Sequence, residues 1–240
     1  MDYNERAIVL LSGGIDSAVC LWLAKEKGWE VYALSFNYYR RQEREKKAAA
    51  ELARAADVLE HRTLEIPFLS EFEDTLFDTE SPLYKQKAMI PREYIPSRNL
   101  VFYSIASSWA EVIGATKIVG GHHKGDLELF PDATPEFLGL LNRAFALGGR
   151  ASTIAEIKCI APLHGKDKTE VLSEAIRLRV PLQLTWSCHT RENVGCGRCT
   201  ACLSRLKSFY ELGVNDPIRY LGESSRQVPR ADFLEEALNE

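Results

Sequence analysis

The chain has 240 residues, a net charge of −4 at pH 7 and an ordinary 45% of hydrophobic residues. This length suits one globular domain with at most a small appendage, and the acidic balance counts against direct nucleic-acid binding over a broad surface. No apolar run reaches the roughly 18 residues that a membrane-spanning helix needs, and the charged first residues do not resemble a signal peptide. We therefore expect a cytoplasmic protein without a membrane partner, whose thiols stay reduced.

The first predicted elements are a buried strand near residues 6–11 and a helix near 17–27, joined by the sequence Ser-Gly-Gly-Ile-Asp-Ser at 12–17. The glycines allow positive φ angles and let backbone N–H groups approach an anion closely. The helix N-terminus adds free donors and a partial positive charge. The turn therefore predicts a cradle for a phosphate or pyrophosphate. The alternative is a plain strand-to-helix turn in which the serines and Asp16 are only caps.

The full pattern S-G-G-x-D-S resembles the PP-loop of the ATP pyrophosphatase (adenine nucleotide α-hydrolase-like) superfamily, whose members cleave ATP between its α and β phosphates to adenylate a substrate. The sequence contains no Walker motif and no G-x-G-x-x-G after the first strand, which counts against a Walker-type NTPase and a dinucleotide site. The resemblance implies ATP as cosubstrate, with Mg²⁺. It places the nucleotide against Leu11, Ser12, Gly13, Gly14, Asp16 and Ser17.

Further strands alternate with helices along the rest of the chain. The strand candidates lie near 30–36, 61–65, 117–121 and 156–160, with a short one near 182–186. The helical patterns lie near 41–56, 98–113, 134–148 and 167–178. This alternation predicts an α/β fold, a Rossmann-like open parallel sheet with helices on both faces. Residues 67–97 hold four prolines and are expected to form a long connection over the edge of the sheet where the strands end and where ligands bind.

Four of the six cysteines lie close together, with the spacing C-x7-C-x2-C-x2-C: Cys188, Cys196, Cys199 and Cys202. Four thiolates suit a tetrahedral Zn²⁺ ion and leave no position open for water, so the spacing indicates a structural zinc site. A [4Fe–4S] cluster and a redox C-x-x-C pair are the alternatives. We expect a nucleotide-binding domain over 1–186 and a small helical zinc-binding segment packed on it over 187–240. Cys20 and Cys159 fall in apolar patterns and are expected in the core.

The two motifs together resemble the 7-cyano-7-deazaguanine synthase family (QueC, also called ExsB), and matches lie between them. Residues 94–99, Y-I-P-S-R-N, resemble the family's [FY]-[VI]-P-G-R-N element, with Ser97 in place of glycine. Residues 126–137 resemble its D-x3-[YF]-P-D-x2-x-E-F element, and residues 162–170 resemble its P-L…K-x-E segment. The resemblance covers residues 6 to about 212.

The resemblance implies a ligase that adenylates 7-carboxy-7-deazaguanine and uses ammonia to form 7-cyano-7-deazaguanine for queuosine or archaeosine synthesis. It also implies a homodimer, and free ammonia is expected because no glutaminase domain precedes the loop. Asp16, Arg98 and Lys168 are the expected catalytic residues. The planar fork of Arg98 suits a phosphate or carboxylate, and Lys168 could neutralise charge on the leaving pyrophosphate. Their alternatives are a surface ion pair and a solvated lysine.

The acceptor is expected to contact Arg98, Asp126, Phe130 and Asp132. Phe130 could supply a stacking face and Asp132 could accept from the donors of a base, while capping and turn formation are the alternatives for the two aspartates. The chain departs from the family pattern at 39–42 and at Leu129, Ala133 and Thr134. Two other functions are therefore kept open. One is a family paralogue with another acceptor, such as deazaguanine-based protein or nucleic-acid modification, including antiviral defence. The other is a tRNA-modifying PP-loop enzyme.

Overall fold

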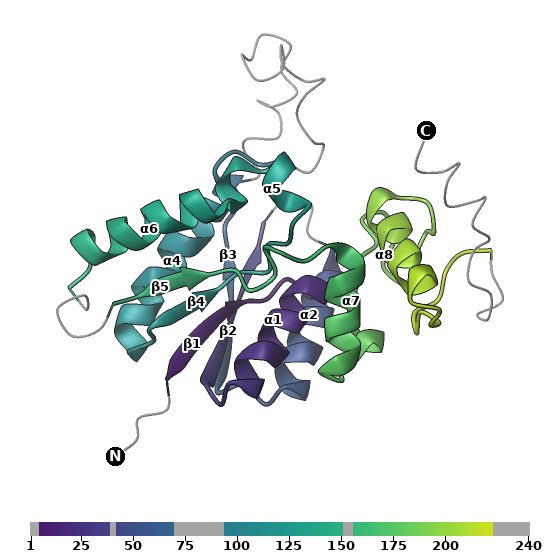
Figure 1. Ribbon diagram of the computed structural model, residues 1–240, viewed down its shortest axis with the longest axis horizontal. Coiled ribbons are helices and arrows are strands. Elements are labelled where there is room, and N and C mark those ends of the chain that lie inside the picture. The colour runs from purple at the N-terminus through teal and green to yellow at the C-terminus, as the bar shows by residue number, and fades with distance from the viewer. Residues whose placement is uncertain (1–4, 39–41, 70–93, 151–155, 223–240) are drawn as a thin grey trace, which may run out of the picture.

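The computed structural model describes residues 5–38, 42–69, 94–150 and 156–222 (Figure 1). Five parallel strands form one sheet in the order β3-β2-β1-β4-β5. Their bounds are β1 Arg6–Leu10, β2 Glu30–Asn37, β3 Glu60–Glu65, β4 Lys117–Val119 and β5 Lys158–Ile160. The strand order reverses between β1 and β4. Folds of this kind bind ligands beyond the carboxyl ends of the strands at that point.

Helices cover both faces of the sheet (Figure 1). The helices are α1 Ile15–Glu26, α2 Glu43–Ala55, α4 Arg98–Ile113, α5 Asp126–Leu129, α6 Pro135–Gly148, α7 Lys168–Arg177 and α8 Thr200–Glu211. Along β1 the side chains of Ala7 and Val9 pack with α1, α2 and α7, whereas Ile8 packs with α4 and α6. Because both faces of β1 are covered, the strand is apolar from Ala7 to Leu10 rather than alternating. The predicted α/β fold is confirmed.

Besides the apolar clusters on the two faces of the sheet, a separate buried cluster holds α8 to the rest of the molecule. It joins Trp186 and three of the four clustered cysteines to Leu203 and Leu206 of α8, and to Ala48 of α2. Figure 1 shows α8 beside α7, at the end of the molecule away from α6. No helix in the described ranges is long and apolar enough to cross a membrane.

The short strand predicted near 182–186 is wrong. Leu182–Leu184 form a 3₁₀ turn, because the carbonyl of Leu182 accepts bonds from the backbone N–H and the hydroxyl of Thr185. Leu182 and Leu184 both pack from this turn against the apolar cluster that includes α1 and α7. The central part of the predicted long connection, 70–93, and residues 39–41 lie outside the described residues.

Candidate functional site

The turn between β1 and α1 has the geometry of an anion cradle. Gly13 has φ +95°, and a Cβ there would lie 2.6 Å from the carbonyl oxygen of Glu45 in α2. No other residue type fits that position without a backbone shift. Gly14 is the N-cap residue of α1, so the first N–H groups of the helix open toward the edge of the sheet.

Two serine hydroxyls lie within this turn. The Oγ atoms of Ser12 and Ser17 are 3.0 Å apart, and Ser17 Oγ donates to the carbonyl of Gly14 at 3.1 Å. The N–H groups of Ser12 and Gly14 in turn donate to these hydroxyls at 3.2 and 3.3 Å. Hydroxyl and amide donors thus share one small region at a helix N-terminus, which is the chemistry that a phosphate requires.

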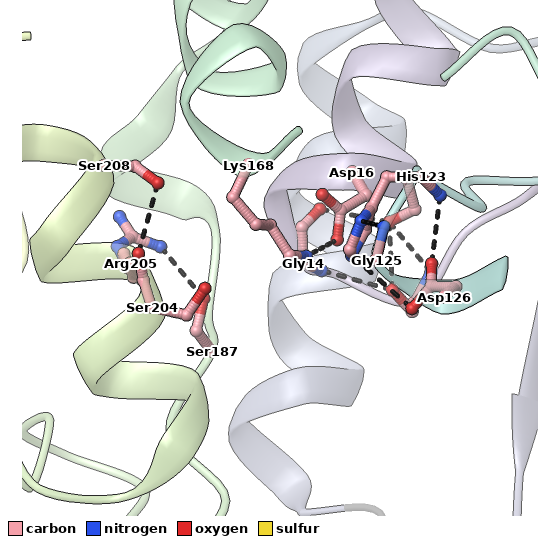
Figure 2. Close-up of polar contacts among 12 residues, drawn as sticks. Gly14, Asp16, His123, Gly125, Asp126, Lys168, Ser187, Ser204, Arg205 and Ser208 are labelled. Atoms are coloured by element: carbon pink, nitrogen blue, oxygen red, sulfur yellow. Dashed lines mark hydrogen bonds and ion pairs between the residues drawn. The ribbon is translucent and has the colours of Figure 1, made fainter. Parts of the chain in front are cut away.

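Lys168 reaches this loop from the far end of the chain. Its Nζ donates to Asp16 Oδ2 at 2.7 Å (Figure 2). Asp16 Oδ1 is buried and has no hydrogen-bond partner among the described residues. The structure therefore brings two of the predicted catalytic residues together, and one carboxylate oxygen keeps its capacity to accept a donor or a cation.

A capping box fixes the start of α7, where Lys168 is the first helical residue. The Asp167 carboxylate accepts from the N–H of Glu170 at 2.8 Å, and the Glu170 carboxylate accepts from the N–H of Asp167 at 2.8 Å. Two orphan donors of the helix are satisfied at once. The backbone of Lys168 is therefore held in place beside the loop.

A cavity of about 840 Å³ opens between the loop and α8. Tyr38 and Arg98 lie on its wall with Asp16 and Lys168, and the rest of the lining includes Trp186, Ser187, His189, Glu192 and residues of α8. Arg98 Nη1 donates to the Tyr38 hydroxyl at 3.5 Å, and its guanidinium lies 5.8 Å from the ring centre. The volume falls in the range of small-molecule sites, and the cationic side chains of Lys168, Arg98 and Arg205 lie on its wall.

Asp132 caps α4. Its Oδ2 accepts from the Asn99 N–H at 2.9 Å, and its Oδ1 accepts from Asn99 Nδ2 at 3.1 Å. The structure thus realises the capping alternative for Asp132, and the cap also fixes the backbone next to Arg98. Asp126, Phe130 and Asp132 are not among the described residues that line the cavity.

Asp126 closes a turn around His123 (Figure 2). Its Oδ2 accepts from the His123 N–H at 3.0 Å, and His123 Nδ1 accepts from the Gly125 N–H at 2.9 Å. Nδ1 is therefore unprotonated, and Nε2 lies 3.4 Å from Asp126 Oδ1. Burial, and then the charge of Lys168, lowers the pKa of His123.

Three of the predicted acceptor residues, Arg98, Asp126 and Asp132, lie close enough to His122 for their charges to act on its ring. Burial lowers the pKa of His122 to about 4. Its Nε2 is buried without a hydrogen-bond partner among the described residues. The paired histidines after β4 were the only signal in the sequence, and a histidine pair by itself is weak.

Two of the departures from the family pattern have structural roles here. Thr134 is the N-cap of α6, and its Oγ1 accepts from the Phe137 N–H at 3.2 Å. Ala133 is buried, and its carbonyl lies 2.8 Å from His164 Nε2. Leu129 is exposed.

The four clustered cysteines are brought together. Their Sγ atoms all lie within 4.8 Å of one another. Backbone N–H groups of Cys196 and Cys199 donate to Cys188 Sγ at 3.4 Å and to Cys196 Sγ at 3.2 Å. Hydrogen bonding from Cys202 lowers the pKa of Cys199 to about 4, and the same hydrogen bond, followed by burial, raises the pKa of Cys202. Four sulfur atoms this close form a donor set that suits a thiophilic cation, which would hold all four as thiolates.

The remaining two thiols are core residues, as expected. Cys20 and Cys159 are buried, and burial raises the pKa of Cys159 to about 12. Neither has the exposed, electropositive setting of a reactive thiol.

Sequence reasoning missed two residues beside the cavity, Trp186 and Arg205. The Trp186 N–H donates to the carbonyl of Gly13 at 2.9 Å. Arg205 forms a buried ion pair with Asp216, and their side chains are only 2% and 5% exposed. An arginine in an amphipathic helix carries no sequence signal that separates it from a surface arginine.

The sequence model of the family described as "Queuosine biosynthesis protein QueC" matches residues 6–213. A 7-cyano-7-deazaguanine synthase from Oceanobacillus iheyensis is 37% identical over 221 residues, which are 91% of this chain and 99% of that protein. The enzyme of the same name from Desulfitobacterium hafniense is 38% identical over 223 residues, with 92% and 96% covered. A solved structure described as a "predicted subunit of tRNA methyltransferase" from Methanocaldococcus jannaschii has a TM-score of 0.50 at 18% identity, covering 72% of this chain and 74% of that one. This last likeness concerns the fold alone.

Proposed function

The chain belongs to the QueC family of queuosine biosynthesis proteins, and on that premise we propose that it is an ATP-dependent 7-cyano-7-deazaguanine synthase. The observation that carries the proposal is the contact between Lys168 and Asp16 on the wall of a cavity of about 840 Å³. This contact places a cation beside the phosphate cradle. The chain is also similar to 7-cyano-7-deazaguanine synthases over nine-tenths of its length.

The reaction begins at the α-phosphorus of ATP. A carboxylate oxygen of 7-carboxy-7-deazaguanine attacks this atom, the bond to the bridging oxygen breaks, and pyrophosphate leaves. Ammonia then displaces AMP from the acyl adenylate to form an amide and loses a proton. The amide oxygen attacks the α-phosphorus of a second ATP and releases a second pyrophosphate; loss of the two N–H protons then expels AMP, which carries that oxygen, and leaves the nitrile. AMP and pyrophosphate are the nucleotide products.

The residues at the loop serve the leaving group. The N–H groups at the start of α1 and the hydroxyls of Ser12 and Ser17 bind the pyrophosphate oxygens. Lys168 lies at 2.7 Å from Asp16, so its ammonium neutralises the charge that grows on pyrophosphate as the bond breaks. Arg98, held by Tyr38 on the cavity wall, binds the acceptor carboxylate or the phosphate of the adenylate.

Asp16 is also the residue that would hold Mg²⁺. Its Oδ1 is a buried carboxylate oxygen without a partner among the described residues, and Mg²⁺ takes one or two carboxylates together with substrate phosphates. The ion would supply charge neutralisation at the phosphates.

We propose that Asp126, Phe130 and Asp132 form the acceptor end of the site. Asp132 binds the N–H of Asn99, next to Arg98 on the cavity wall, which supports this. The charges of Asp126, Asp132 and Arg98 also act on the ring of His122. Although Asp132 caps α4, each carboxylate oxygen has a second lone pair and can still accept from a base.

We propose that Cys188, Cys196, Cys199 and Cys202 hold a structural zinc ion. Their four sulfur atoms lie within 4.8 Å of one another, and four thiolates make a closed tetrahedral site. About one zinc per chain is expected by elemental mass spectrometry. Bound iron with a brown colour would overturn the assignment in favour of an iron–sulfur cluster.

We also propose a cytoplasmic homodimer in which 187–240 form the zinc-binding segment of a domain built from 1–186. The family resemblance supports the dimer, and the buried cluster that joins Trp186 to α8 supports packing of the segment on the domain. Light scattering coupled to size-exclusion chromatography measures the mass, and a monomer at micromolar concentration would contradict the dimer.

The deciding experiment combines the purified protein with ATP, Mg²⁺, ammonium and 7-carboxy-7-deazaguanine, with products identified by mass spectrometry. We expect AMP, pyrophosphate and the nitrile. Asp16→Asn should lower turnover by about a hundredfold without unfolding the protein. The control Glu26→Gln, which removes a surface partner of Arg177, should leave turnover unchanged.

Two other outcomes would redirect the proposal. Nucleotide binding without any response to the deazaguanine acid would favour a paralogue with another acceptor. Salt-dependent binding of tRNA with a steep slope would favour a tRNA-modifying enzyme.

A further inference from the structure

Arg205 lies on the wall of the nucleotide cavity, yet it is not available to bind an anion. Its Nε and Nη2 donate to the two oxygens of Asp216 at 2.6 and 2.9 Å, and Nη2 also donates to the carbonyl of Leu182 at 3.2 Å. Its Nη1 donates to Thr185 Oγ1 at 2.8 Å and lies 3.4 Å from Ser187 Oγ. A guanidinium has five N–H donors, and here each has an acceptor within the protein.

The partner of this guanidinium is equally occupied. Asp216 also accepts from the Tyr220 hydroxyl at 2.6 Å and from the Ile218 N–H at 3.1 Å. A buried ion pair with every lone pair and proton in use is rigid, because any rotation leaves a buried polar group unsatisfied. Its role is therefore to hold geometry rather than to bind substrate.

The segment that Arg205 binds, residues 185–187, is in turn connected to the phosphate cradle. Figure 2 shows Arg205 reaching from α8 to Ser187, across from Gly14 and Asp16. Thr185 and Ser187 flank Trp186, whose backbone N–H donates to the carbonyl of Gly13 at 2.9 Å. Because Gly13 is already in contact with the backbone of α2, this bond fixes the orientation of the peptide between Gly13 and Gly14.

We propose that Arg205 is a positioning residue for nucleotide binding, which sets the Gly13–Gly14 peptide of the cradle through Thr185 and Trp186. The inference rests on the proposed role of this loop in binding ATP. If segment 185–187 loosens, the cradle has its binding geometry for only a fraction of the time. The apparent dissociation constant for the nucleotide then rises by the inverse of that fraction.

Replacing Arg205 would strand the charge of Asp216 in the interior and could unfold the protein, so the test is made at Thr185. Thr185→Val keeps the shape of a fully buried side chain but removes the oxygen that accepts from Arg205. Thr185→Ser keeps the oxygen and loses a methyl group, so it is the matched control.

Calorimetry with α,β-methylene-ATP and Mg²⁺ measures affinity, and hydrogen exchange measures protection of the Trp186 amide. In Thr185→Val we expect about tenfold weaker binding and about tenfold faster exchange, because a buried hydrogen bond to a charged group is lost. Thr185→Ser should stay within about twofold of the wild type in both measurements.

Each other result overturns the inference. Equal weakening in both variants would assign the effect to lost packing, and wild-type affinity in Thr185→Val would mean that the cradle keeps its geometry without Arg205. If the wild-type protein binds no nucleotide at all, the proposed function fails and this inference fails with it. The wild-type titration therefore separates the two failures.

Discussion

Ser97 carries backbone strain at the entry to α4. It has φ 53° and ψ 25°, a left-handed conformation that costs a residue with a Cβ about 1 kcal/mol or more. It precedes Arg98, and its position is the one where the resembling family element has glycine. The conformation gives a physical reason for that glycine, which the sequence alone did not supply.

Ser97→Gly should therefore raise the free energy of unfolding by about 0.5–1 kcal/mol, because relief of the left-handed conformation outweighs the extra freedom of glycine in the unfolded chain. Chemical denaturation measures the change. Ser104→Gly in the interior of α4 is the opposite control, since it should cost about 0.5–1 kcal/mol. A loss of stability in Ser97→Gly would show that this backbone is not strained.

His122 makes stability depend on pH. Burial holds its pKa near 4, below the ordinary value of 6.5, with Asp126, His164, Asp132 and Arg98 as the charged or titratable groups around it. Well above pH 6.5, from about pH 7.5, the ring is neutral in both the folded and the unfolded state. As the pH falls from about 6.5 to about 4 the unfolded chain binds a proton that the folded protein does not, so stability is lost by up to about 1.4 kcal/mol per pH unit.

His122→Gln should flatten the fall in unfolding free energy between pH 6.5 and pH 4 relative to the wild type. Between pH 7 and pH 8 the two proteins should differ by a constant. Parallel curves over the acidic range would mean that this histidine protonates as easily in the folded protein as in the unfolded chain.

At the level of elements, local signals in the sequence predicted well and contacts between distant elements did not. The glycine turn at 12–17, with the strand before it and the helix after it, was predictable because backbone conformation and donors there depend on adjacent residues. The strand predicted at 182–186 was wrong because its pattern could not reveal that Thr185 bonds back to Leu182 and that Arg205 binds the same turn. The role of Asp132 as a cap was kept open because Asn99 lies 33 residues away.

The capping box of α7 should matter for nucleotide binding as well as for stability. Asp167→Ala removes the acceptor for the Glu170 N–H, which should cost about 1 kcal/mol and let the first turn fray. Lys168 lies in that turn and contacts Asp16, so affinity for ATP should fall several-fold.

Thr134→Ala is the matched comparison, because it removes the equivalent cap of α6 at a similar cost of about 1 kcal/mol. We expect it to leave ATP affinity unchanged. Denaturation measures the stability of both variants and calorimetry measures binding. Equal affinities in the two variants would mean that the position of Lys168 does not depend on its cap.

At the scale of the whole molecule, the sequence predicted which parts exist but not how one part supports another. The cysteine spacing predicted a metal site, and the loop predicted a nucleotide site. The link between them passes through Trp186, whose indole N–H donates to the carbonyl of Cys188 at 3.1 Å while its backbone N–H reaches Gly13. Such a link depends on the packed geometry of segments distant in the chain, which periodicity and motif spacing cannot encode.

From this link we predict that the proposed zinc ion and the nucleotide affect each other's binding. Cys199 is the N-cap residue of α8, and Cys202 lies in its first turn, so loss of the metal should loosen the helix that carries Arg205. Chelation or Cys199→Ser should therefore weaken ATP binding, and because such coupling is reciprocal, nucleotide should slow the release of zinc.

A chelating dye measures zinc release with and without α,β-methylene-ATP, and we expect release to be at least about fivefold slower with nucleotide, the lower end of typical coupling between sites. Cys159→Ser is the control for thiol replacement, because this buried residue lies on β5 in the core on the α4 and α6 face of the sheet. It should keep its zinc and its response to nucleotide. A release rate that nucleotide leaves unchanged in the wild type, with ATP binding intact, would mean that the cysteine cluster stabilises α8 without any influence on the cradle.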